Sequence, residues 1–377
     1  MTWIFWISIL LVFLTYFGYP ILLGFYSLFN TYEVKRNIIL PRVTIIIPFY
    51  NAEGQLSKKF DNTLQLNYPK ELLDIIAVSD CSQDSSDEIA KSYSNRGVRN
   101  FRLEKRSGKH YAQERALKYA TGEIIIFTDV GILLSPDTVE LLVRNFADPL
   151  VGCVSSTDMI IEQDGRAVNS EGAYIRYDMW LRKMESKVCS STGMSGSLYA
   201  ARKELCDNWI PYLSNDYYIA LRSVMRGFKS ILDDEVIGYY QLVSSHQQEF
   251  IRKVRTIIHG IEVLFEFKGI LNPFRYGFYS FEVIGHKLMR WLVPFFLILI
   301  LVSNIFLVTH GVFYQSVMVL QLLFYLIALL SHRFEKIQAF APFRVICFFS
   351  IANLSILVAW YNFVLGKKFI IWEPSKR

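Results

Sequence analysis

Apolar residues gather in three long stretches without an Asp, Glu, Lys or Arg, at residues 1–32, 291–332 and 345–366. Each is longer than the ~20 residues that a helix needs to cross the ~30 Å hydrocarbon core of a bilayer. The middle stretch is too long for one helix and predicts two spans with a break near residues 309–311. We therefore expect one N-terminal and two or three C-terminal transmembrane helices, and the pattern leaves open whether one C-terminal segment is instead re-entrant or interfacial.

Between these stretches, short β-branched runs alternate with segments of helical periodicity. Strands are predicted at 43–49, 73–79, 101–103 and 123–128, and helices at 53–66 and 109–119. This alternation predicts an α/β domain whose mostly parallel sheet has helices on both faces. No Gly-x-Gly-x-x-Gly follows a predicted strand, which disfavours a dinucleotide-binding domain.

Composition and charge support a membrane protein. With 52% apolar residues, the chain is too hydrophobic for an ordinary soluble domain. Its net charge of +6 is modest, and basic residues flank the apolar stretches, as Lys35, Arg36 and Arg42 do after the first. We interpret them as orientation signals that contact anionic lipid headgroups, with the N-terminus outside and the domain in the cytoplasm, rather than as a nucleic-acid surface.

Two further observations concern compartment and processing. The five cysteines are odd in number and show no Cys-x-x-Cys spacing, which argues against a disulfide framework or a zinc site and fits a reducing cytoplasm. The first apolar stretch lacks the basic start of a signal peptide and exceeds its usual apolar length, so we expect an anchor rather than a cleaved leader.

Polar residues follow the carboxyl ends of the predicted strands. Tyr50 and Glu53 follow the first strand, Asp80 the second, and Asp129 the last. In parallel sheets ligands bind at this edge, so these residues are expected to share one site.

Six short motifs occur in a fixed order. They are Ile47–Glu53, Ser79–Asp84, Gly108–Lys109, Phe127–Asp129 with Pro136–Asp137, Gly193–Ser197, and Asn215–Asp216. Together they resemble family 2 glycosyltransferases of the GT-A fold, particularly membrane-bound bacterial members of envelope and exopolysaccharide pathways, and the resemblance extends over nearly the whole chain. It implies an inverting transfer of a sugar from a nucleotide sugar, with a UDP-sugar as first expectation, to a lipid-linked or growing glycan acceptor.

The resemblance also implies donor-binding roles. Pro48, Tyr50 and Glu53 match the loop that contacts base and ribose, Asp80 matches the aspartate that holds the nucleoside, and Lys109 would face the diphosphate or ribose. From the residues alone, the alternatives are a polar strand-end loop, a helix cap for Asp80 and a solvated helix start for Lys109.

Asp129 is expected to bind a divalent cation, Mg²⁺ or Mn²⁺. Such ions take carboxylate, phosphate and water oxygens, and they act as Lewis acids toward a leaving diphosphate. The family supplies an Asp-x-Asp here, but this chain has Gly131 in place of the second acid. His246 and Asp137 are weaker candidates for a further ligand, and Asp137 is more simply explained as a helix start.

Asp216 matches the family's general base, which takes the proton of the acceptor hydroxyl. Asn215 replaces the usual Glu beside it, and the alternative role for Asp216 is a helix cap. Gly193, Ser195 and Gly196 form a small-residue loop that would let the backbone approach the donor or acceptor closely, unless it is a plain turn.

Residues 250–267 predict an amphipathic helix lying in the membrane interface. Arg255 there is a candidate diphosphate contact. The family's Gln-x-x-Arg-Trp signature of processive synthesis lacks its Gln and Trp at this place. Two rival functions are a processive polysaccharide synthase coupled to secretion and a non-catalytic scaffold that has lost the second metal-binding acid.

The sequence thus predicts an integral, multi-pass protein of the bacterial inner membrane with a cytoplasmic catalytic domain. Its expected partners are a nucleotide-sugar donor, a glycan or lipid-linked acceptor and membrane lipids, and no nucleic acid. The expected segments are an N-terminal anchor (1–32), the GT-A catalytic domain (38–245), amphipathic interface helices (246–290), a transmembrane block (291–366) and a short basic tail (367–377).

Overall fold

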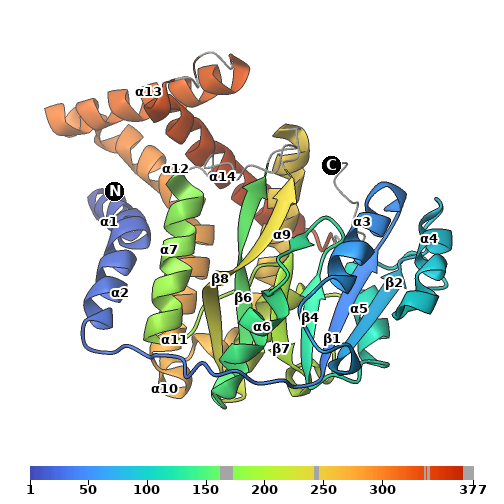
Figure 1. Ribbon diagram of the computed structural model, residues 1–377. Helices are drawn as coiled ribbons and strands as arrows, with labels where there is room; N and C mark the ends of the chain where they lie inside the picture. Colours follow the sequence, from blue (N-terminus) through green and yellow to red (C-terminus); the bar gives the residue numbers. More distant parts are fainter. Residues whose placement is uncertain (162–172, 242–245, 335–336, 338–339, 368–377) are drawn as a thin grey trace. The chain divides into compact units, whose positions relative to one another are not determined.

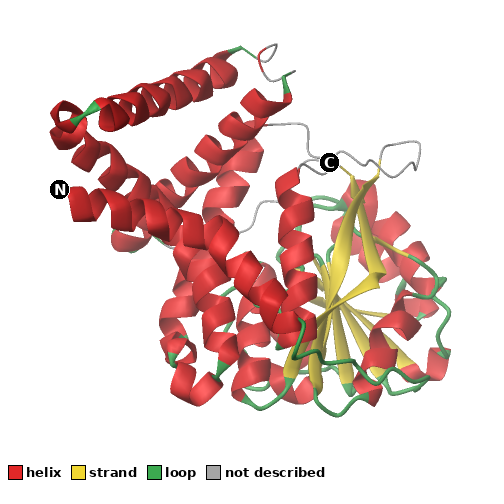
Figure 2. Cartoon of the chain, turned by 90° about the vertical axis from the view of Figure 1, so that its left-hand side faces the viewer, coloured by secondary structure: helices red, strands yellow, loops and turns green. Residues whose placement is uncertain are grey.

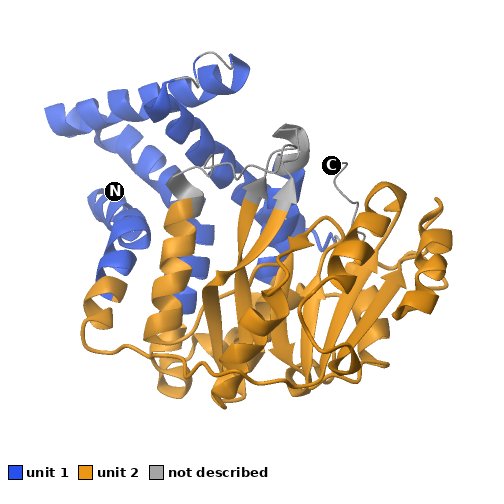
Figure 3. Ribbon diagram, viewed as in Figure 1, with its two compact units in different colours: residues 1–22, 246–261, 281–368 blue, residues 23–245, 262–280, 369–377 orange. Residues whose placement is uncertain are grey.

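The computed structural model describes residues 1–161, 173–241, 246–334, 337 and 340–367. As far as they are described, the residues form two compact units (Figure 3). One unit is drawn from residues 1–22, 246–261, 281–334, 337 and 340–367, and the other from residues 23–161, 173–241 and 262–280. The first unit holds the long apolar helices and the second holds the sheet.

The second unit is built on an eight-stranded sheet of order β3-β2-β1-β4-β7-β6-β8-β5. The strands are β1 (Val43–Phe49), β2 (Leu73–Ser79), β3 (Val98–Arg102), β4 (Ile124–Thr128), β5 (Leu133–Leu134), β6 (Val151–Ile161), β7 (Leu198–Arg202) and β8 (Lys229–Gln241). The first four strands in chain order are parallel, as expected, and lie side by side in Figure 1. Strand β7 is antiparallel to β4 and β6, so the sheet as a whole is mixed.

Helices cover both faces of this sheet, as expected for an α/β domain (Figure 2). They are α3 (Glu53–Leu64), α4 (Ser86–Ser92), α5 (Lys109–Leu117), α6 (Thr138–Val143), α7 (Ala173–Val188) and α8 (Asn215–Met225). Ile45 and Ile47 of β1 share one core cluster with α3, α4 and α6. Ile46 points to the opposite face, because side chains alternate along a strand, and α5 packs on β1 and β2 outside that cluster.

Strand β1 ends in an arrangement that prepares the site. Its pairing with β4 stops at Ile46, whereas its pairing with β2 continues through Phe49. The Phe49 carbonyl accepts the Asp80 amide at 2.8 Å, so Phe49 faces β2 and the nitrogen of Pro48 faces the side where β4 no longer pairs. Proline has no N–H to donate, and at this position none is needed.

The helices of the other unit match the apolar stretches. Among the described residues, four segments are long and apolar enough to cross a membrane: Thr2–Ser27, Phe278–His310, Val312–Arg333 and Ala341–Val364. They contain the helices α1 (Thr2–Phe13), α2 (Tyr19–Ser27), α11 (Phe278–Val283), α12 (Met289–Leu307), α13 (Val312–Arg333) and α14 (Ala341–Val364). The expected break near residues 309–311 is confirmed, because Gly311, with φ of 140°, separates the second segment from the third. One N-terminal and three C-terminal segments therefore fit a bilayer by length and composition.

The segment that leads into β1 is fixed to the sheet domain by polar contacts. Arg36 forms ion pairs with Asp233 at 3.3 Å and with Glu235 at 3.4 Å, and the Tyr32 hydroxyl donates to Asp148. Arg36, which we expected to contact lipid headgroups, is thus held by carboxylates of its own domain.

Candidate functional site

The ends of β1 and β2 meet in two tight loops. Asn51 and Cys81 follow these strands with φ of 45° and 62°, in the left-handed region that side-chain-bearing residues seldom adopt. The loops hold each other, since the Asn51 carboxamide oxygen accepts the Gln83 amide at 2.8 Å and the Asn51 amide donates to Ser82 Oγ. Unfavourable backbone conformations fixed by neighbouring bonds are common where ligands are held.

Asp80 is buried, with 1% of its surface exposed, and accepts hydrogen bonds on both carboxylate oxygens. The Ser107 amide donates to Oδ1 at 2.7 Å and the Gly108 amide to Oδ2 at 2.8 Å. Burial raises the pKa of Asp80, although these two bonds oppose the shift. Asp80 therefore positions the start of α5 and with it Lys109, and its expected contact with the nucleoside stays a prediction.

The loop after β1 is tied to the start of α4. The Glu53 carboxylate accepts the Ser85 amide at 3.1 Å, and the Glu53 amide donates to Asp84 at the same distance. Tyr50 is 8% exposed, and the guanidinium carbon of Arg106 lies 3.9 Å from the centre of its ring. Arg106 thus covers one face of the Tyr50 ring, which we expected to stack on the base. A base contact by Tyr50, Glu53 or the buried Pro48 remains a prediction.

Asp129, Lys109 and Gly196 meet at the carboxyl end of β4. Lys109 Nζ lies 2.5 Å from Asp129 Oδ1 and donates to the Gly196 carbonyl at 2.8 Å. The Asp129 amide in turn donates to the Ser197 carbonyl at 3.0 Å. The structure therefore brings together a carboxylate, an ammonium and the small-residue loop that the sequence singled out separately.

Asp216 lies on the other side of that loop, in the first turn of α8. The Ser214 hydroxyl donates to Asp216 Oδ1 at 2.5 Å. A Cβ at Gly196 would lie 3.2 Å from Asp216 Oδ2, so a glycine there leaves room for the carboxylate. Asn215 is buried and donates to the Gln113 side chain at 2.8 Å, which fixes the start of α8 against α5.

Asp158 in β6 belongs to the same region and was missed by the sequence reasoning. Its carboxylate accepts from the hydroxyls of Ser195, at 2.8 and 2.9 Å, and Ser197, at 2.6 Å. Burial raises the pKa of Asp158 and the nearby Asp129 carboxylate adds to this effect, against the two serine bonds. The sequence predicts no element around Asp158, so this acid gave no signal there.

The oxygen ligands near Asp129 fit a divalent cation only in part. Among the described residues, no three His, Cys, Asp or Glu side chains gather closely enough to hold a metal. Asp129 nevertheless offers a partly exposed carboxylate at the strand end. One carboxylate fits Mg²⁺ or Mn²⁺ when phosphate and water oxygens complete the shell, but it does not form a cage for a resident ion.

The remaining candidates belong to other elements. Arg255 is part of α9 (His246–Glu266), in a stretch that groups with the apolar helices. Asp137 precedes α6 as its N-terminal cap residue, as expected for a helix start. The His246 side chain lies outside the described residues, and so does the tail from residue 368 onward.

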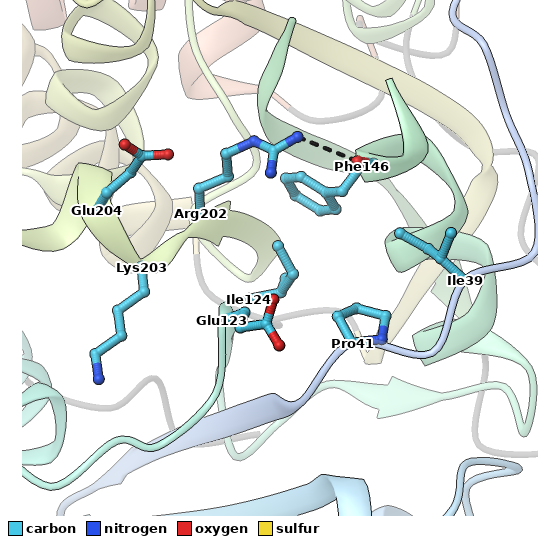
Figure 4. Close-up of a pocket in the computed structure, with 8 residues that line it drawn as sticks. All are labelled: Ile39, Pro41, Glu123, Ile124, Phe146, Arg202, Lys203 and Glu204. Atoms are coloured by element: carbon cyan, nitrogen blue, oxygen red, sulfur yellow. Dashed lines mark hydrogen bonds between the residues drawn. The ribbon is translucent and has the colours of Figure 1, made fainter. Parts of the chain in front are cut away.

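A cleft of about 400 Å³ lies at the opposite end of the sheet (Figure 4). Pro41 and Glu123 in its wall precede β1 and β4, so the cleft adjoins the amino ends of the parallel strands. Arg202 there donates to the carbonyls of Val151 and Phe146 at 2.7 and 3.1 Å. Since its guanidinium is satisfied by backbone carbonyls, we interpret this cleft as structural.

Comparisons with known proteins show what this chain is similar to. Residues 44–210 match the profile described as Glycosyl transferase family 2. Poly(ribitol-phosphate) beta-N-acetylglucosaminyltransferase TarS of Staphylococcus aureus (strain Mu50 / ATCC 700699) is 28% identical over 101 residues, 26% of this chain and 18% of that protein. Poly(ribitol-phosphate) beta-glucosyltransferase of Bacillus spizizenii is 34% identical over 91 residues, 23% of this chain and 14% of that protein. The chain thus matches less than a fifth of the length of either relative.

The fold has a solved counterpart. The mannosyltransferase PcManGT from Pyrobaculum calidifontis, solved in complex with GDP-Man and Mn²⁺, superposes with a TM-score of 0.75 at 21% identity, covering 97% of this chain and all of that chain. At this identity the likeness shows the fold, which is GT-A.

Gly196→Ala should lower transfer activity while the protein still folds. The added Cβ meets the Asp216 carboxylate at 3.2 Å and displaces it by a few tenths of an ångström, and we expect roughly a tenfold loss, since misplacements of ~1 Å can cost ~10²-fold. Gly54→Ala, where a Cβ meets nothing within 4 Å, is the matched control. Equal turnover by the two variants in detergent would contradict the close contact.

Proposed function

We propose that this chain, whose residues 44–210 match the profile of glycosyl transferase family 2, moves one sugar from a nucleotide sugar to a lipid-linked or growing glycan acceptor with inversion. A UDP-sugar is the first expectation for the donor. One observation carries the proposal. An ammonium paired with Asp129 and the carboxylate of Asp216 lie on either side of the Gly196 backbone. Such a site offers a cation for the diphosphate and a base for the acceptor on the two sides of one loop.

Asp216 would take the proton from the acceptor hydroxyl as that oxygen attacks the anomeric carbon. Its carboxylate is fixed at one oxygen by the Ser214 hydroxyl, which leaves Oδ2 beside Gly196 to face an acceptor. No second carboxylate is needed to protonate the leaving group, because a nucleoside diphosphate leaves as an anion. This differs from glycoside hydrolysis, which uses a pair of acids.

Lys109 would bind the diphosphate, and Asp129 would hold Mg²⁺ or Mn²⁺ together with phosphate oxygens. When bound, the metal supplies Lewis-acid neutralisation of the leaving diphosphate. The presence of Mn²⁺ with GDP-Man in the Pyrobaculum mannosyltransferase supports this assignment. Because that donor carries guanosine, the test of function is a panel of UDP- and GDP-sugars with release of nucleoside diphosphate as the readout. No release with any donor would refute the proposal.

The acceptor is proposed to be a cell-envelope or exopolysaccharide glycan. Two relatives are named for transfer to poly(ribitol phosphate), and four described segments of this chain are able to span a bilayer. A polymer or lipid-linked acceptor at the membrane fits both facts. The donor-contact roles of Pro48, Tyr50, Glu53, Asp80 and Arg255, and the segment boundaries given above, remain predictions.

Asp216→Asn should abolish transfer while nucleotide affinity changes little. Asn keeps the shape but does not take up a proton, and general-base catalysis is worth ~10²–10⁴-fold. Turnover and nucleotide binding are measured on the same detergent-solubilised preparation. Asp207→Asn, at an exposed acid in the approach to α8, is the control and should match wild type. Transfer by Asp216→Asn within tenfold of wild type would refute its role as the base.

Activity should require Mg²⁺ or Mn²⁺ at millimolar concentration, because one carboxylate holds the ion loosely without the donor. Asp129→Ala should remove activity, whereas Asp137→Ala, at the exposed start of α6, should stay within about twofold of wild type. The measurement is turnover against metal concentration after chelation. Full turnover in excess EDTA would exclude the metal.

The sheet domain should lie in the cytoplasm and the N-terminus outside, in what we propose is a bacterial inner membrane. Positive charges cluster just after the first span. An excess of Lys and Arg within ~15–20 residues of the end of a span marks its cytoplasmic side. Single cysteines at Thr2 and Lys91, both exposed, are introduced into a background without the five native ones. An impermeant thiol reagent applied to intact cells should label Thr2→Cys and spare Lys91→Cys, and the reverse pattern would overturn the orientation.

A further inference from the structure

Lys59 is a fully buried lysine under the candidate site. It lies in α3, none of its surface is exposed, and its neighbour Lys58 points into solvent. The Lys59 ammonium donates to Thr128 Oγ1 at 2.9 Å and to the Ile132 carbonyl at 2.7 Å. These two acceptors belong to the last residue of β4 and to the far end of the turn that carries Asp129.

The turn has a bond of its own, from the Ile132 amide to the Asp129 carbonyl at 3.2 Å. From the core side, Lys59 links the two ends of this turn a second time, because its ammonium bonds to both Thr128 and Ile132. Asp129 and Gly131 lie within this closed turn. The side chain of Asp129 is therefore positioned in part by a lysine 70 positions earlier in the sequence.

A hydrogen bond alone does not explain a lysine at this place. Asn62, one helical turn further along α3, binds the backbone of Leu134 with a neutral amide. Its Nδ2 donates to the Leu134 carbonyl and its Oδ1 accepts the Leu134 amide, both at 2.9 Å. Burying an ammonium against neutral acceptors is far more costly than burying an amide. The charge of Lys59 must therefore be stabilised by something else in its surroundings.

The nearby Asp129 carboxylate is the group that stabilises this charge. Burial lowers the pKa of Lys59 to about 7, and the Asp129 carboxylate opposes that shift. Lys109 contacts the same Asp129 carboxylate at 2.5 Å. When Lys59 is protonated, its charge adds to that of Lys109, and the region attracts an anion with more than one charge.

We infer that Lys59 is a positioning residue for the nucleotide diphosphate: its buried ammonium closes the Thr128–Ile132 turn and fixes the Asp129 carboxylate, and through it Lys109, for that ligand. This inference rests on the proposed function, in which Lys109 binds the donor's diphosphate and Asp129 holds the metal ion beside it. It assigns Lys59 a function in ligand affinity and not in the stability of the fold.

The test uses the full chain in detergent, with UDP or GDP, whichever wild type binds, plus Mn²⁺ as the probe. Lys59→Met keeps the length of the side chain and removes both charge and donor. We expect it to weaken nucleotide affinity by about tenfold or more, in the range of coupled charged neighbours. Lys59→Gln retains an amide donor without charge and should be intermediate. Lys58→Met, at the adjacent exposed position, should bind like wild type.

A double-mutant cycle separates positioning from a general structural role. In an Asp129→Asn background, Lys59→Met should change affinity by less than about twofold, because the group it acts through has lost its charge. Melting temperature is measured on every variant. A Lys59→Met effect that persists undiminished beside Asp129→Asn overturns the inference, as does unchanged affinity with a lowered melting temperature. Should Lys59→Met fail to fold, Lys59→Gln and Thr128→Val enter the same cycle with the same criteria.

Failure of the two proposals can be told apart. If wild type binds the nucleotide with Mn²⁺ but releases no nucleoside diphosphate from any donor, the proposed transfer is refuted. The double-mutant cycle on Lys59 still decides this inference, because it measures nucleotide affinity. If wild type binds neither nucleotide with Mn²⁺, there is no diphosphate site for Lys59 to position, and the inference falls as well.

Discussion

The ammonium of Lys109 joins three parts of the chain that are distant in sequence, and the arrangement of the site depends on it. It contacts Asp129 after β4 and the Gly196 carbonyl in the loop before β7, and Gly196 borders the Asp216 carboxylate. A diphosphate that draws Lys109 toward itself weakens its bonds to both partners. In the proposed site, donor binding is therefore linked to the loop beside the proposed base, Asp216, through a single charge.

Strand periodicity and strand-end polarity were sufficient to predict the parallel half of the domain. The runs at 43–49 and 73–79 are β1 and β2 without a shift, because a strand covered on both faces is mostly apolar along its length. Motif order placed Asp80 correctly at a strand end but did not reveal its partners. These are the backbone amides of Ser107 and Gly108, and a residue pattern carries little information about which main-chain groups will lie nearby.

The mixed half of the sheet and the supports of the site escaped the sequence. Strand β7 is short and pairs antiparallel with β4 across some seventy residues of chain, a contact that no local pattern encodes. Lys58 and Lys59 are adjacent in sequence and chemically identical, yet one is exposed and the other fully buried. Periodicity separates apolar from polar faces, so a lysine on the core-facing side of α3 looks like part of the solvated face until the turn above it is placed.

The acid that Gly131 replaces has not simply moved to Asp158. That carboxylate is already committed to the hydroxyls of Ser195 and Ser197, and its pKa is raised by burial and by Asp129, so binding a cation there would require breaking satisfied bonds. Meanwhile Asp129 is paired with the Lys109 ammonium, and its charge opposes the lowering of the Lys59 pKa by burial. A lone carboxylate so surrounded attracts a divalent cation weakly, whereas a diphosphate is attracted by both lysines and supplies the oxygens that such an ion lacks. For the proposed donor site, the electrostatics favour metal and nucleotide binding together, because the diphosphate supplies the oxygens that complete the shell of the ion.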